Sequence, residues 1–424
     1  MSTDLQPPHS IKLAAGWTFA ALLAGLALGA ALSGGPAHGP ALAVAGPVGT
    51  IWLRALQMTI VPLVASLLVI GIAQMVATAR AGPVARRTLF GFFAILAAGT
   101  VFAAFAMPAL LEAFPIPGRA AAALAAEGAA QPVPGLGAFF ESLVSDNVIA
   151  AAAETAMLPL VVFFVAFGVA ITRLAEPQRE VLLRLFEALG QAMLTIIGWV
   201  LWLAPAGVFA LAFGVGLTSG GGAFAVLAHY ILLVAGIGLV VLIAGYALGT
   251  IGGERGLPQF ARAMLPAQAV AISTQSSLAS LPAMLQSCRT LGVRETTADF
   301  VLPLAVALFR ATGAAMNLAV AIYLARLAGI ELTPGAIAAG VAVALVTTVG
   351  SVSLPGAVSF VAAIGPVAIA MGVPIEPLAL LIAVEMLPDI MRTLGNVTMD
   401  VAVTATVDRN SASNDDPDIT VATP

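Results

Sequence analysis

Long apolar runs decide the fold class of this chain. Of its 424 residues, 60% are hydrophobic and only 9% are charged, whereas about a quarter of the residues in a soluble domain are charged. A helix needs about 20 consecutive apolar residues to cross the hydrocarbon core of a bilayer. The sequence therefore predicts an all-α integral membrane protein that crosses the lipid bilayer several times. Six such runs come first, near residues 13–33, 48–76, 88–112, 147–174, 190–217 and 224–251.

The rest of the composition excludes several classes of function. A net charge of −4 gives no basis for a nucleic-acid partner. The single cysteine, Cys288, cannot form an intramolecular disulfide, and its surroundings lack the spacing of a metal site. The sequence has no serine-histidine pair or paired-aspartate motif that would indicate an enzyme. We therefore expect a protein that is not an enzyme and has no cofactor.

Positive charges indicate how the chain is oriented. Cytoplasmic loops carry an excess of lysine and arginine, which places residues 1–12 in the cytoplasm. We expect the protein in the plasma (inner) membrane. The run at 13–33 is longer than the apolar core of a signal peptide, although cleavage within GAALSGG (29–35) remains open. The charges that alternate between connections are Lys12, then Arg80, Arg86 and Arg87, then Arg173, Arg179 and Arg184.

Two uncharged segments in the last third of the chain are interrupted at their centres. STQSSLASLP (273–282) divides the first, and TTVGSVSLPGAVS (347–359) divides the second. Glycine, proline and serine there indicate half-helices that meet at a tip, where freed backbone groups line a polar cavity. We expect re-entrant hairpins near 258–290 and 334–373, although two complete helices joined by a loop are an alternative, above all for the second segment.

Each expected hairpin precedes a helix that carries charge, near 297–328 and 375–407. Such a duplication is typical of inverted repeats whose binding site lies where broken helices meet near the midplane. We therefore divide the chain into six transmembrane helices over 13–251 and a core transport region over 252–408. Residues 409–424 are polar and are expected to be a disordered tail.

A polar stripe lies in EMLPDIMRTLGNVTMD (385–400). At 100° per residue its members fall within an arc of about 80°, with Thr393 at the edge. An ionised side chain at the centre of a membrane helix costs about 2.5 to 3.5 kcal/mol, so this face is expected to point inward. Its guanidinium suits a carboxylate, and its carboxylates suit an ammonium group or a cation. Alternatively, Asp389 and Arg392 form an ion pair that only joins helices. The stripe consists of Glu385, Asp389, Arg392, Asn396 and Asp400.

These motifs, in this order, resemble the dicarboxylate/amino acid:cation symporters, the family of glutamate and aspartate transporters. The resemblance rests on STQSSLASLP, SVSLPGA and MRTLGNVTMD, and on MTIVPLVASLLVIGIAQM (58–75) as the second helix, so it covers most of residues 13–407. It implies a homotrimer of chains with eight transmembrane helices and two re-entrant hairpins. The first, second, fourth and fifth helices would form the scaffold, and the remaining elements would move as an elevator.

The resemblance also implies roles for individual residues. Arg392 would bind the distal carboxylate of a small acidic solute, and Asp389 would bind its amino group. Thr393 and Asn396 would add hydrogen bonds, and Asn396 would contribute with Asp400 to a sodium site. The tips of the hairpins would close over the substrate, with Ser276 and Ser277 in the first hairpin and Ser353, Pro355, Gly356 and Ala357 in the second.

The seventh helix departs from the family pattern. The family carries Asn-Met-Asp-Gly-Thr there, whose asparagine and aspartate bind sodium, whereas this chain has FRATG (309–313). Phe309 and Ala311 stand in the places of the two ligands and offer no side-chain oxygen, which sodium prefers. We therefore expect two sodium sites to be damaged or absent. A shifted register would bring Asn317 of MNLA (316–319) onto the motif, but it requires an insertion.

Arg310, in place of the methionine, leaves three interpretations open. Its permanent charge would replace that of sodium if the side chain reached Asp400 or the cation pocket. It would instead bind the substrate directly, or it would pair structurally with Glu385 or extend toward the membrane surface. His229 could carry a proton, although a single histidine in an apolar helix is more often a hydrogen-bonded packing residue.

The sequence thus predicts a secondary transporter of acidic amino acids or dicarboxylates. The coupling ion is left open between sodium and a proton, because the family's sodium motif is replaced. An anion exchanger or facilitator and a transport-deficient binding protein are alternatives. A channel is disfavoured, because polar residues concentrate in the last third of the chain instead of lining several spans.

Overall fold

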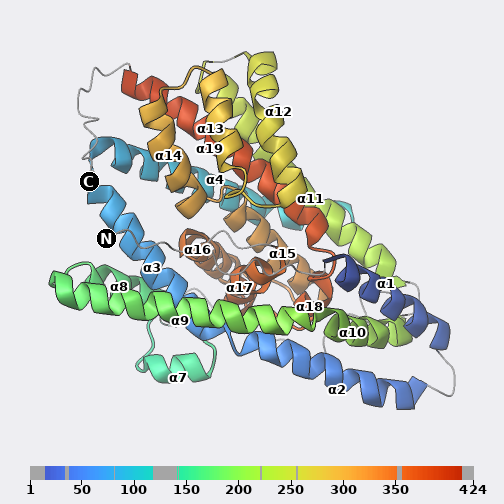
Figure 1. The fold of residues 1–424 in the computed structure, drawn as a ribbon. Coiled ribbons are helices and arrows are strands. Elements are labelled where there is room, and N and C mark those ends of the chain that lie inside the picture. Colours follow the sequence, from blue (N-terminus) through green and yellow to red (C-terminus); the bar gives the residue numbers. More distant parts are fainter. Residues whose placement is uncertain are drawn as a thin grey trace.

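The computed structural model describes residues 15–33, 38–80, 82–117, 141, 143–219, 222–254, 256–350 and 356–412. All regular secondary structure in these ranges is helical (Figure 1). This agrees with the predicted all-α membrane protein. Five segments of the described chain are long and apolar enough to cross a membrane: Gly39–Arg80, Ala85–Ala113, Glu176–Trp202, Phe224–Ile251 and Glu295–Leu327.

Some of the predicted N-terminal runs are divided. The run at 48–76 is two helices that meet at Met58 and Thr59, where the Thr59 hydroxyl donates to the Leu56 carbonyl at 2.7 Å and helps to end the first. The run at 147–174 is divided at Thr155, whose φ of 54° is left-handed. The helices of this half are α1 (Ala15–Leu32), α2 (His38–Gln57), α3 (Ile60–Arg80), α4 (Pro83–Ala113), α7 (Val148–Ala153), α8 (Met157–Ile171), α9 (Glu176–Trp202), α10 (Ala204–Ser219) and α11 (Gly222–Ile251).

The C-terminal part contains two pairs of neighbouring helices at the positions of the expected hairpins. In the first pair, α12 (Leu257–Thr274) packs against α13 (Leu281–Thr290), and in the second α16 (Pro334–Gly350) packs against α17 (Gly356–Ala370). The tip of the second pair, residues 351–355, lies outside the described residues. Ser353 and Pro355 are therefore not placed.

The helix predicted over 297–328 is interrupted, which corrects that prediction. It consists of α14 (Glu295–Leu308) and α15 (Gly313–Leu327). Arg310, between them, has a φ of 37°, in the left-handed region that L residues adopt at a cost. The Gly313 N–H donates to the Arg310 carbonyl at 2.7 Å and closes a tight turn. FRATG thus forms a break at the centre of the segment instead of continuous helix.

The last predicted helix, over 375–407, is also different. A short helix, α18 (Leu378–Leu381), is followed by turns, and the long helix α19 (Met386–Ala412) begins only after Glu385. This helix extends into the segment predicted as a tail, of which 413–424 lie outside the described residues. Its first turns contain the polar stripe.

The helices pack as two groups. One group contains α1, α2, α3, α8, α9 and α10, and the other contains α4, α11 to α17 and α19. They meet mainly where α3 contacts α4, α16 and α17 (Figure 1), and α8 and α9 also contact α17. Within the second group α19 lies along α11, and a Cβ at Gly245 would lie 3.3 Å from the Met399 nitrogen, so a small residue permits this close approach. The polar stripe is therefore enclosed by protein.

Candidate functional site

The polar stripe of α19 is buried, as its spacing on one helical face predicts. Glu385 and Asp400, at its two ends, are only 2% and 1% exposed. The three residues between them, Asp389, Arg392 and Asn396, are also buried. Buried charges are tolerated when they are paired and hydrogen-bonded, so the partners of each side chain decide what this region can bind.

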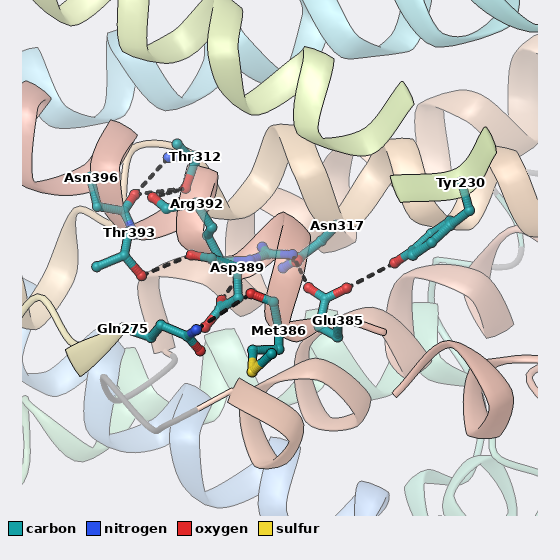
Figure 2. Close-up of polar contacts among 10 residues, drawn as sticks. All are labelled: Tyr230, Gln275, Thr312, Asn317, Glu385, Met386, Asp389, Arg392, Thr393 and Asn396. Atoms are coloured by element: carbon teal, nitrogen blue, oxygen red, sulfur yellow. Dashed lines mark hydrogen bonds and ion pairs between the residues drawn. The ribbon is translucent and has the colours of Figure 1, made fainter. Parts of the chain in front are cut away.

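Arg392 lies at the centre of the site (Figure 2). Its Nη1 donates to Asn317 Oδ1 at 2.8 Å, and its Nη2 donates to Glu385 Oε1 at 3.0 Å. Its Nε lies 3.3 Å from Asp389 Oδ1. All three guanidinium nitrogens thus face acceptors of the protein, two of which are carboxylates. The same planar fork suits a solute carboxylate.

Tyr230 on α11 holds the second oxygen of Glu385. Its hydroxyl donates to Glu385 Oε2 at 2.8 Å, and the tyrosine side chain is fully buried. Glu385 therefore bridges a phenol on α11 and a guanidinium on α19 (Figure 2). Its own backbone carbonyl accepts from the Asp389 N–H at 2.9 Å, which places the carboxylate at the start of α19.

Asn396 holds the broken segment against α19. Its Oδ1 accepts from the Thr312 N–H at 2.9 Å and from the Thr312 hydroxyl at 2.8 Å. The same hydroxyl lies 3.0 Å from the Arg392 carbonyl. A Cβ at Gly395 would lie 2.4 Å from Thr312 Cγ2, so the close approach requires glycine at this position. Two donors already occupy the Asn396 oxygen.

The residues in place of the family's sodium ligands are packed as apolar residues. Phe309 is fully buried and stacks on Phe92 of α4, with ring centroids 4.4 Å apart. Ala311 is 1% exposed. A stacked aromatic ring and a methyl group cannot supply the side-chain oxygens that sodium prefers.

Arg310 belongs to the same electrostatic cluster. The charges that act on it are those of Arg392 and Asp389, and Arg310 in turn acts on Asp389. Glu385 pairs with Arg392, and the acidic group whose charge acts on Arg310 is Asp389.

Asp400 lies two turns beyond Arg392 and differs from the other carboxylates. Its Oδ1 is buried and has no hydrogen-bond partner among the described residues. Its backbone carbonyl accepts from the Thr404 hydroxyl at 2.7 Å. A buried carboxylate oxygen without a donor is costly, so this position suits a bound cation or a proton.

Comparison with known proteins agrees with this chemistry. The model of the sodium:dicarboxylate symporter family matches residues 15–410. The chain belongs to this family. A proton/glutamate-aspartate symporter of Escherichia coli (strain K12) is 28% identical over 364 residues, which cover 83% of this chain and 82% of the relative. A proton/sodium-glutamate symport protein of Bacillus subtilis (strain 168) is 29% identical over 402 residues, covering 90% and 88%. Neutral amino acid transporter B(0) of Oryctolagus cuniculus is 30% identical over 455 residues, covering 95% and 82%.

The first hairpin of this family member comes close to the site at its tip. Gln275 has a left-handed φ of 51°, and its Nε2 lies 3.5 Å from the Met386 carbonyl at the start of α19 (Figure 2). Ser276 and Ser277 follow it, and the Ser276 hydroxyl accepts from the Ala279 N–H at 3.2 Å. The serines therefore shape a turn next to the site. In the second hairpin, Gly356 and Ala357 begin α17.

The sequence assigned no role to Tyr230 or Thr312 and considered Asn317 only in a shifted register of the cation motif, although all three contact the stripe. Asn317 had a signal, because it is a lone amide within an apolar run of a family whose last helices carry the site. Tyr230 had none, because a tyrosine next to His229 in an apolar helix is an ordinary packing residue until its partner is known. Thr312 becomes important only because the helix is broken beside it.

Proposed function

We propose that this protein is a secondary transporter that carries small acidic solutes across the plasma membrane, and that it does so without sodium. The observation that carries the proposal is a buried guanidinium held between carboxylates, next to a segment that has lost its sodium ligands. Acidic amino acids are the first candidates as substrates, because two of the relatives are named as glutamate or glutamate-aspartate symporters.

Arg392 is the proposed partner of the solute's distal carboxylate. In the structure Glu385 Oε1 lies 3.0 Å from Arg392 Nη2. The Glu385 carboxylate thus pairs with the guanidinium in the way proposed for the solute carboxylate. Asp389, 3.3 Å from Nε, would bind the ammonium group of an amino acid. Thr393, whose hydroxyl bonds to the Asp389 carbonyl at 2.9 Å, and the first hairpin's Ser276 complete the proposed pocket.

The remaining residues of the proposed pocket are assigned by family position. Ser277 on the first hairpin, together with Ser353, Pro355, Gly356 and Ala357 on the second, would enclose the solute. Arg310, through its charge beside Asp389, would add a second guanidinium. Two positive groups favour a solute with two carboxylates over a neutral amino acid.

Three features support sodium independence. Phe309 and Ala311 supply only backbone oxygens, and the Asn396 oxygen accepts two hydrogen bonds from Thr312. Arg310 places a permanent positive charge in the cluster. A residual cation site would retain Asp400 alone, with an oxygen free of other partners among the described residues. One free carboxylate oxygen is few for sodium, which prefers several oxygen ligands.

The packing supports a moving unit. The group that contains α1, α2, α3, α8, α9 and α10 corresponds to the scaffold that the family resemblance implies, and the other group carries the whole site. We propose that the second group moves as an elevator relative to the first in a homotrimer, with residues 1–12 in the cytoplasm.

A binding experiment tests the proposal. Purified protein in detergent is heated with L-aspartate, L-glutamate, succinate or L-alanine, each in sodium, potassium and choline chloride. A ligand that binds the folded state raises the melting temperature. We expect at least one dicarboxylic solute to raise it equally in the three salts and L-alanine to have no effect. Stabilisation that occurs only in sodium would contradict the proposal, as would stabilisation by L-alanine alone.

A further inference from the structure

The charges around the Arg392 guanidinium balance before any solute is bound. Arg392 lies against Glu385 and Asp389, and Arg310 acts on Asp389. At their formal charges, these two guanidiniums and two carboxylates sum to zero. An acidic amino acid with a net charge of −1 would leave the buried cluster negative. A buried uncompensated charge is strongly unfavourable, so a positive charge has to enter with the solute.

Sodium is poorly suited to supply that charge in this chain. Its ligand positions hold Phe309, stacked on Phe92, and Ala311. The remaining small cation is a proton, which needs only one carboxylate oxygen. The three buried carboxylates of the stripe, Glu385, Asp389 and Asp400, are the candidates to receive it.

The geometry points to Glu385 as the proton-binding site that is coupled to solute binding. A solute carboxylate that takes two N–H groups of Arg392 competes with the acceptors already there. If Glu385 Oε1 loses its 3.0 Å hydrogen bond from Arg392 Nη2, this oxygen stays buried without a charged hydrogen-bond donor. A proton from bulk water then binds Oε1, no other covalent bond changes, and the cluster with its bound solute is neutral.

The other candidates fit this role less well. Asn317 is a neutral amide, and Asp389 has to stay ionised to hold the solute's ammonium group. Asp400 is not among the three acceptors at the Arg392 guanidinium, so a solute that binds there displaces none of its contacts. Glu385 Oε2 accepts from the Tyr230 hydroxyl at 2.8 Å, and a tyrosine hydroxyl can both donate and accept. Glu385 therefore keeps a hydrogen-bond partner in either protonation state. The inference rests on the proposed function, because it requires an acidic solute at Arg392.

A second titratable group lies nearby and has to be tested. His229 Nε2 is 2.9 Å from the Phe114 carbonyl, so this nitrogen carries hydrogen, and Nδ1 is 3.2 Å from the Tyr323 hydroxyl. The hydroxyl can serve Nδ1 whether or not a second proton is bound. The titratable and charged groups linked to Glu385 through these contacts are Tyr230, Tyr323 and His229 on one side and Arg392, Asp389 and Arg310 on the other. The other such groups on α11, α15 and α19 are Tyr246, Arg326, Asp400, Asp408 and Arg409.

Calorimetry of L-aspartate binding counts the protons. Titrations in two buffers with different enthalpies of ionisation, at one pH, give the number of protons taken up per bound solute. We expect about one proton for the wild-type protein, and a Kd that rises by about tenfold per pH unit while Glu385 is ionised in the empty protein. The glutamine of Glu385→Gln is uncharged at every pH, as protonated Glu385 is. This variant is therefore expected to bind L-aspartate with no proton uptake and with a Kd that does not depend on pH.

Two control variants separate the outcomes. Glu376→Gln removes an exposed carboxylate outside the site, and His229→Gln removes the second titratable group; both are expected to keep the uptake of one proton. Uptake that persists in Glu385→Gln, or that disappears in His229→Gln, would overturn the inference. Binding of L-aspartate by the wild-type protein without proton uptake would overturn the inference and leave the proposed function intact. This measurement needs no variant. Absence of binding by L-aspartate, L-glutamate and succinate would remove the proposed function, and the inference with it.

Discussion

Replacing Arg392 by lysine tests whether the fork of the guanidinium, and not only its charge, holds the solute. The three nitrogens of Arg392 meet Asn317 at 2.8 Å, Glu385 at 3.0 Å and Asp389 at 3.3 Å. A lysine ammonium is a single point charge that cannot span three acceptors or bind a carboxylate with two parallel bonds. One hydrogen bond to a charged group contributes about 1.5 to 3 kcal/mol. Losing one toward the solute raises Kd by about 10- to 150-fold.

Isothermal titration with L-aspartate measures this change directly. Arg409→Lys is the matched control, because Arg409 lies at the end of α19, half exposed, and pairs with Glu254 at 2.6 Å outside the site. The control is expected to bind as the wild-type protein does. If Arg392→Lys, correctly folded by its melting curve, also binds within threefold of the wild type, the solute carboxylate does not bind at this guanidinium.

Two further substitutions test the broken segment. Asn396→Ala leaves the buried N–H of Thr312 without its acceptor, whereas the hydroxyl keeps the Arg392 carbonyl at 3.0 Å. The unmade bond costs about 1 to 3 kcal/mol, so a lower melting temperature and weaker solute binding are expected. An unchanged melting curve would show that this contact does not hold the segment. Phe309→Ala removes the ring that stacks on Phe92 and is expected to destabilise the protein by about 3 to 5 kcal/mol. The variant is expected to show no change of melting temperature with sodium. A higher melting temperature in sodium chloride than in choline chloride would show that the ring only blocks an intact sodium site.

The polar stripe could be predicted because its signal is local. Five polar residues at helical spacing in a membrane-spanning segment must share one face, and charge cannot face lipid. The family resemblance then predicts that Arg392 and Asp389 bind an acidic solute. The pair of Arg392 with Asp389 was also considered from spacing along one helix, whereas the contact of Arg392 with Glu385 was not predicted.

Contacts between helices could not be predicted in the same way. Tyr230 reaches the site because α11 packs beside α19, and Asn317 reaches it from α15, which packs against α11. No pattern within either helix encodes this arrangement. The break at Phe309–Thr312 was missed because a left-handed arginine has no reliable sequence signal, whereas the glycine after it is compatible with continuous helix. The divisions of the N-terminal runs were missed because hydropathy measures the length of an apolar run and not the continuity of its backbone hydrogen bonds.

Uptake by protein reconstituted in liposomes tests the central claim most directly. Radiolabelled L-aspartate is added outside in sodium, potassium or choline chloride, with and without an inward proton gradient. We expect the initial rate to be the same in the three salts and to rise when the proton gradient is imposed. Uptake that requires sodium and does not respond to the proton gradient would contradict both the sodium-independent site and the proton on Glu385.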